Sequence, residues 1–222
     1  IAKMIGYIPT SCRAANSELT VRVNDVPSTT TSLTMDKGTV FTSSIDGTSY
    51  QFVTNQSYTI QPDSGVFQFA GVKAFEGTLV TFKYTKDNSD PDQRFILTNN
   101  NIDTSTLKVS VQNSTSDSTT EVYTLATGFG DLTATSKVYF LQEAEDGKFE
   151  VYFGDGLLGK KLSDGNIVIL EYIVTNKTEA NGASAFALSG DIDGFSNVSI
   201  TTTSIAANGT EPQTKESIRF NA

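Results

Sequence analysis

Three glycines in one short segment have types and spacing that could bind a phosphate group. Gly154-Asp155-Gly156-Leu157-Leu158-Gly159 follows the pattern Gly-x-Gly-x-x-Gly, and Lys160 and Lys161 come directly after it. In a dinucleotide-binding site such glycines open a helix, and the N–H groups at the start of that helix bind the phosphates. A P-loop instead needs Gly-Lys followed directly by Ser or Thr.

The residues after this segment argue against both phosphate sites. Only Leu157 to Leu162 separate Gly156 from a second turn, Ser163-Asp164-Gly165, and a strand-like run follows. That interval is too short for the helix that a dinucleotide site requires, and Lys161 stands where a P-loop has Ser or Thr. The sequence therefore predicts a turn between two strands. The expected structural turn motif consists of Phe153, Gly154, Asp155, Gly156, Gly159 and Gly165.

Other catalytic and metal-binding chemistry has few suitable residues. The chain contains no His and one Cys, Cys12, which excludes Ser-His-Asp and Cys-His sites and zinc sites built on these residues. Two clusters of carboxylates do not follow the EF-hand spacing for calcium; they are Asp87, Asp90 and Asp92, and Asp191 with Asp193. We expect a protein that is not an enzyme, with no catalytic residue, no cofactor and no metal.

Composition excludes further classes. Hydrophobic residues make up 37% of the 222 residues and charged residues 18%, with a formal net charge of −9. Binding to nucleic acid requires a basic surface, so we expect no nucleic-acid partner. No apolar run approaches the ~18 residues of a membrane helix, and we expect no signal peptide. We therefore expect no membrane contact.

The elements that must position the turn motif are strands. Apolar and polar residues alternate over short runs rich in Thr, Val, Tyr and Phe, and Gly with Asp or Asn separates many of the runs. Short strands at this spacing favour a mainly β fold, with antiparallel sheets in two β-sandwich or barrel-like lobes. The expected strands cover residues 18–23, 39–42, 49–54, 57–61, 65–75, 78–84, 94–97, 105–112, 121–127, 137–145, 148–153, 166–175 and 196–205.

Both ends read as parts of helices. Gly6 follows what resembles a last helical turn, and Thr214 is a suitable N-cap. We therefore expect short helical ends and an internal fragment of a longer protein. Four parts follow: the end of an N-terminal helical region (1–13), a first β lobe (14–90), a second β lobe with the Phe-Gly-Asp-Gly hairpin (91–190), and a return strand with the start of a helical segment (191–222).

Residues 151–186 resemble a signature of the baseplate J-like proteins of contractile phage tails. The shared features are Phe-Gly-Asp-Gly, a further Gly, a second turn with Gly and a strand that ends in Tyr. The sequence is most similar to the large baseplate wedge subunits of T-even-type myophages. Leu162 stands where the family often has proline, and Asn181-Gly182 inverts a Gly-Asn pair. Other stretches agree in the same order: 5–15, 33–54, 94–111 and 214–222.

The resemblance implies a structural protein of the virion. Such a subunit forms a homodimer, joins other baseplate wedge proteins around the central hub and relays host contact into sheath contraction. It would be located in the tail baseplate after assembly in the host cytoplasm. The resemblance implies no catalysis and no small-molecule substrate.

Two other classes stay open at this point. A carbohydrate-binding or adhesin-type β module would need a shallow groove lined by exposed aromatic residues, and the chain has no Trp. A polysaccharide-cleaving enzyme would need two carboxylates across a cleft. With 25 acidic residues in the chain, the sequence alone does not select such a pair.

Overall fold

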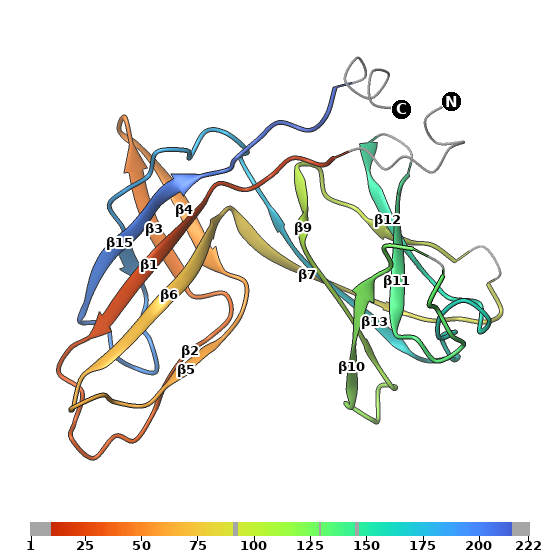
Figure 1. The fold of residues 1–222 in the computed structure, drawn as a ribbon, viewed down its shortest axis with the longest axis horizontal. Helices are drawn as coiled ribbons and strands as arrows, with labels where there is room; N and C mark the ends of the chain where they lie inside the picture. The colour runs from red at the N-terminus through yellow and green to blue at the C-terminus, as the bar shows by residue number, and fades with distance from the viewer. Residues whose placement is uncertain (1–9, 91–92, 129, 145–146, 215–222) are drawn as a thin grey trace.

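The fold is all-β throughout the residues that the structure describes. The structure is a computed structural model, and it describes residues 10–90, 93–128, 130–144 and 147–214 (Figure 1). These residues contain no α-helix. The strands are β1 (Asn16–Val23), β2 (Leu33–Met35), β3 (Val40–Ile45), β4 (Thr48–Thr54), β5 (Tyr58–Ile60), β6 (Phe67–Glu76), β7 (Thr78–Thr85), β8 (Phe95–Leu97), β9 (Ile102–Gln112), β10 (Thr120–Leu125), β11 (Val138–Glu143), β12 (Phe149–Phe153), β13 (Ile167–Val174), β14 (Ala187–Ser189) and β15 (Val198–Ala207).

The first lobe is built on a six-stranded antiparallel sheet with the order β14-β3-β4-β6-β1-β15. Alternation of side chains explains its core, because every second residue of a strand faces the same side. In β1, Leu19, Val21 and Val23 are buried between more exposed neighbours. The short pair β2-β5 adds Leu33 and Met35 to this core.

The second lobe is a seven-stranded sheet with the order β7-β13-β9-β10-β11-β12-β8. Its pairs are antiparallel except β10 with β11, which run parallel over two residue pairs. Aromatic side chains fill much of the core. Phe153 packs edge-on against Phe95 and Tyr123, with ring centroids 5.6 and 5.4 Å away, a geometry that aromatic quadrupoles favour.

The strands of the first sheet come from two separate parts of the chain, with the whole second sheet between them. β7 directly follows β6 yet pairs with β13 in the second sheet, whereas β14 and β15 return to the first. Figure 1 shows the resulting lobes side by side, with the chain crossing between them near the upper middle of the view. The division into parts at residues 13, 90 and 190 stays a prediction about independent units.

The expected all-β fold and antiparallel sheets are confirmed. In detail, the first lobe is a half-barrel and the second a nearly closed barrel. Helical ends are not seen. Thr10 to Arg13 are not helical, and Arg13 instead forms a β-bridge with Thr210. The rest of that prediction falls on residues 1–9 and 215–222, which lie outside the described residues.

Candidate functional site

The glycine loop, residues 154–160, follows β12 and turns the chain back on itself. Gly156 N donates a hydrogen bond to Gly159 O over 3.1 Å, and both glycines have positive φ, 94° and 93°. Residues that carry a side chain rarely adopt this backbone conformation without strain. No helix begins at Gly159, since the next regular element is strand β13. The geometry that a dinucleotide site needs is therefore missing from this loop.

Gly154 is required for a different reason, which is the close approach of two backbone segments. A Cβ on Gly154 would lie 2.3 Å from the carbonyl carbon of Gly159 and 2.5 Å from the carbonyl oxygen of Leu158. A Cβ on Gly159 would lie 3.0 Å from Val138 Cγ2. The two glycines let the ends of the loop touch each other and the start of β11.

Asp155 organises the tip of the loop. Its Oδ1 accepts hydrogen bonds from Leu157 N over 2.8 Å and from Leu158 N over 3.0 Å. The bond from Leu158, followed by that from Leu157, lowers the pKa of Asp155 below its ordinary value, because both stabilise the charged carboxylate. The two leucines stay in solvent, with Leu157 77% and Leu158 44% exposed. The loop thus presents two apolar side chains from a backbone that Asp155 holds in place.

The loop is anchored to the segment before β11. Gly159 N donates to Thr133 O over 3.0 Å, and Lys160 N donates to Ser136 O over 2.8 Å. The ammonium group of Lys160 pairs with Glu121 of β10. These contacts fasten the loop to the segment before β11 and to strand β10.

The remaining expected motif residues lie on either side of the loop. Phe153 ends β12 and belongs to the second core, with Phe149 and Val151 buried on the same face. Gly165 lies in the following turn with φ of 77°, and its N–H donates to Lys86 O over 2.9 Å. Four of the six residues therefore lie in the glycine loop, Phe153 ends the strand before it, and Gly165 lies in the turn that leads into β13.

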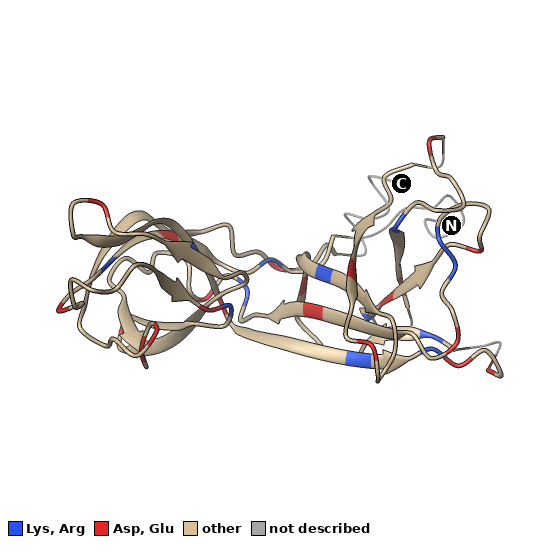
Figure 2. Cartoon of the chain, turned by 90° about the horizontal axis from the view of Figure 1, so that it is seen from below, with Lys and Arg blue, Asp and Glu red and all other residues tan. Residues whose placement is uncertain are grey.

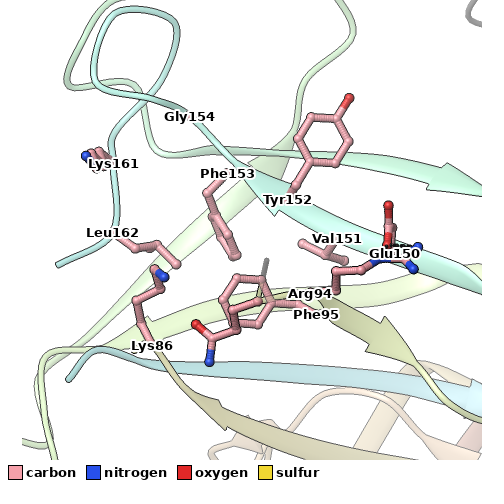
Figure 3. A pocket seen from close by; sticks show the side chains of 11 residues that line it. Lys86, Arg94, Phe95, Glu150, Val151, Tyr152, Phe153, Gly154, Lys161 and Leu162 are labelled. Carbon is pink, nitrogen blue, oxygen red and sulfur yellow. Dashed lines mark hydrogen bonds and ion pairs between the residues drawn. The ribbon is translucent and has the colours of Figure 1, made fainter. Parts of the chain in front are cut away.

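A pocket of about 230 Å³ opens beside the loop (Figure 3). Phe95, Phe153 and Leu162 line it with apolar surface, and Lys86 and Lys161 lie at its rim. Among the described residues that line it, Glu150 is the one with a carboxylate. The carboxylate of Glu150 pairs with Arg94 and accepts a hydrogen bond from Gln142. A glycoside-cleaving site needs two carboxylates, and the described lining residues supply one.

The acidic clusters use their oxygens for turns. Asp87 Oδ1 accepts from Ser89 N and Oγ, and Asp191 Oδ1 accepts from Gly194 N. Asp193 Oδ2 accepts from Thr34 N over 3.2 Å. Within the described ranges, no three acidic or Cys side chains gather closely enough to hold a metal ion. Asp92 lies outside the described residues.

Charge gives no sign of a basic, nucleic-acid-binding surface in the described part of the chain. Figure 2 shows Lys and Arg scattered among acidic residues, many of which lie in loops. None of the described residues forms a helix long and apolar enough to cross a bilayer.

Sequence reasoning missed a buried carboxylate between the lobes. Glu76, the last residue of β6, is fully buried. Its Oε2 accepts from Thr175 Oγ1 over 2.6 Å and from Asn176 N over 2.9 Å, and its Oε1 accepts from Asn176 Nδ2 over 2.7 Å. A signal for it exists: Glu76 continues the inward-facing series of β6, where a charged side chain needs buried partners.

A second buried carboxylate lies nearby on β9. Asp103 is 2% exposed. Its Oδ2 accepts from Ala14 N over 2.9 Å, and its Oδ1 accepts from Ser105 N over 2.9 Å. The segment before β1 is thereby bonded to a strand of the second lobe. Its signal in the sequence is weak, because Asp103 stands beside a polar Asn-rich turn that reads as exposed.

Comparison with known proteins gives two consistent matches. Residues 80–183 match the sequence family described as "Bacteriophage baseplate wedge protein gp6, third domain". The chain is also 28% identical over 200 residues to the baseplate wedge protein gp6 of Enterobacteria phage T4, a match covering 82% of this chain. This chain is a relative of the T-even-type baseplate wedge proteins. The resemblance seen in the sequence is confirmed.

The residues that match the wedge family coincide with the second lobe. The match begins within β7, ends beyond β13 and so contains nearly the whole second sheet, the glycine loop and the pocket. The match to the T4 wedge protein covers 29% of the length of that protein. This chain therefore corresponds to a part of its wedge-protein relative.

Proposed function

We propose that this chain is a structural part of a baseplate wedge in a contractile phage tail. The observation that carries the proposal is the similarity to a T-even wedge protein over 200 residues, joined to a family match over the second lobe. The site geometry agrees with a role other than catalysis. The glycine loop has no helix for a phosphate, and the pocket beside it has one carboxylate that is already paired.

The partners follow from the same proposal. The chain would bind a second copy of itself and other wedge proteins around the hub, and it would relay the signal for sheath contraction. It would reside in the tail baseplate of the virion after assembly in the host cytoplasm. Small molecules, nucleic acids and membranes have no part in this role.

The glycine loop is well suited to a protein contact. Leu157 and Leu158 are exposed, while Asp155 and the anchored ends of the loop hold their backbone in place. A loop whose backbone is already ordered loses little backbone conformational entropy on binding. The loop therefore offers a small preformed apolar surface, made by Leu157 and Leu158, to a neighbouring baseplate protein.

Location in the virion tests the proposal directly. Antibodies raised against this chain, coupled to gold, are applied to particles of the phage that encodes it and viewed by electron microscopy. Label at the baseplate end of the tail is expected. Label on fibres together with specific binding on a glycan array would support the adhesin alternative instead, and unlabelled particles would contradict a place in the virion.

A further inference from the structure

The two lobes meet in a small core of their own. Ala14, Val53 and Ile173 are buried there and belong to the segment before β1, to β4 and to β13. Three partly buried side chains pack against them from both lobes: Val40, Phe75 and Leu79. A cluster of this size contributes modestly to holding two lobes together, because apolar stabilisation scales with the area buried.

The backbones at this junction approach very closely. Gly77 joins β6 to β7 with φ of 119°, and a Cβ on it would lie 2.1 Å from Val174 O at the end of β13. Gly209, which follows β15, would bring a Cβ to 2.1 Å from Lys177 O. Asn181 closes the same region by exchanging two hydrogen bonds of 2.9 Å with the backbone of Gly209. The crossing segments are thus fixed side by side.

Glu76 and Asp103 supply the strongest polar contacts at the junction. Both carboxylates are buried. Glu76 accepts three hydrogen bonds of 2.6 to 2.9 Å from Thr175 and Asn176, which follow β13. Asp103 accepts one of 2.9 Å across the junction from Ala14 N, and two from Ser105 on its own strand hold the carboxylate in place. Hydrogen bonds to a charged group are stronger than neutral ones. A buried carboxylate that loses its donors is costly, which makes each contact hard to open alone.

We propose that Glu76 and Asp103 form a latch that holds the two lobes as one body, and that the two contacts open together. The lobes of a latched molecule would move as a unit, so that a displacement of one lobe displaces the other. The inference concerns this chain by itself. It can fail while the proposed baseplate role stands.

Cys12 provides a natural probe of the latch. Its thiol is 3% exposed, donates to Ile102 O over 3.2 Å and lies at the junction between the two lobes. Burial, and secondarily the charge of Asp103, raise the pKa of Cys12 to about 11. The thiol therefore reacts with a disulfide reagent only when the junction opens, and Cys12 is the single cysteine of the chain.

The experiment compares the reaction of Cys12 with 5,5′-dithiobis(2-nitrobenzoic acid) in the 222-residue chain and three variants. Glu76→Gln and Asp103→Asn each replace an acceptor oxygen by a donor at the latch. Glu150→Gln is the matched control, because Glu150 is also a buried carboxylate but lies within the second lobe. Rates are compared for the thiolate, after correction for the pKa of Cys12 measured in each variant, because Asp103→Asn also removes a charge that raises this pKa. We expect the latch variants to react roughly ten- to a hundredfold faster than the parent, from the strength of hydrogen bonds to charged groups, and the control to react as the parent does.

Hydrogen exchange measures whether the two contacts open together. The amide of Ala14 is bonded to Asp103, and the amide of Asn176 is bonded to Glu76. We expect Glu76→Gln to accelerate exchange at Ala14, and Asp103→Asn to accelerate exchange at Asn176, although neither change touches the amide measured. Acceleration only at the amide next to each substitution would overturn the coupled latch.

Two further outcomes bear on the proposal. Equal Cys12 rates in all three variants would show that reactivity follows overall stability, and would overturn it. If Glu76→Gln or Asp103→Asn does not fold, Thr175→Val and Ser105→Ala remove one donor each from the same carboxylates. Faster Cys12 reaction in these milder variants supports the latch, and an unchanged rate refutes it.

Discussion

Gly154 and Gly159 lie in backbone contact across the mouth of the glycine loop, with no room for a Cβ on Gly154. This contact closes the loop at its base, and hydrogen bonds anchor the loop to the segment before β11. Glycine is needed at two positions of the loop for two different reasons. Gly154 is needed for space, whereas Gly156 is needed for its positive φ. The two reasons predict different tolerances to substitution.

Gly154→Ala should lower the free energy of unfolding by about 1–3 kcal/mol, because the new methyl group forces two backbone segments apart. Urea denaturation followed by circular dichroism measures the change. Gly128→Ala is the control, since a Cβ there meets nothing within 4 Å. Equal midpoints for the two variants would contradict the close approach.

Gly156→Val should destabilise the chain by about 1–3 kcal/mol through backbone strain at positive φ. Space is not limiting, because a Cβ on Gly156 would lie an ordinary 3.6 Å from Lys161 Cβ. Gly156→Asn should cost less, since Asn adopts positive φ more readily. Thermal melting of the pair decides the point; a Val variant that melts with the parent would refute the strained turn.

Asp155 should stabilise the loop in a pH-dependent way. Its pKa is lowered by the N–H groups of Leu158 and Leu157, so its contribution is present above the ordinary value of 3.8 and is lost as the pH falls through the lower folded value. The gap in melting temperature between the parent and Asp155→Ala should therefore shrink on acidification below that range. A gap that stays constant would show that the carboxylate does not act through its charge.

Leu157→Asp and Leu158→Asp should weaken assembly without unfolding the chain, because both side chains are exposed and a charge opposes burial in an apolar contact. Co-purification with the baseplate proteins encoded by the same phage genome measures the effect. Ile205→Asp is a matched control on the first lobe, where Ile205 is 60% exposed. Loss of binding only in the control would place the contact elsewhere.

Strand positions could be predicted from the sequence because alternation is local. The expected runs 49–54, 78–84 and 166–175 correspond to strands β4, β7 and β13, with ends that differ by one residue or less. Alternation tells which side chains share a face, and it contains no information about the partner strand. The pairing of β7 with β13 joins residues about ninety positions apart in the chain, as with Lys83 and Ile169. Which strands belong to which sheet could therefore not be predicted from local sequence patterns.

The turn at the glycine loop could be predicted from the sequence, because the segment after Gly156 is too short for the helix that a phosphate site needs. The anchoring of the loop to Thr133 and Ser136 was not accessible, since that segment is irregular and polar. The burial of Glu76 could be inferred from its place in the inward-facing series of β6. Its donors Thr175 and Asn176 could not, because they lie in a segment far along the chain that crosses back between the lobes. Long-range polar contacts of this kind depend on the assembled fold.

The discontinuous first sheet sets an order for folding during synthesis. All seven strands of the second sheet lie between Thr78 and Val174, so that lobe is complete when this stretch has left the ribosome. The first sheet must wait, because β1 pairs early with β6 but gains its second neighbour only when β15 emerges, as the pairing of Glu18 with Ser204 shows. The nascent chain therefore carries an unfinished half-barrel with β1 exposed along one side, a stage at which chaperones would be most needed.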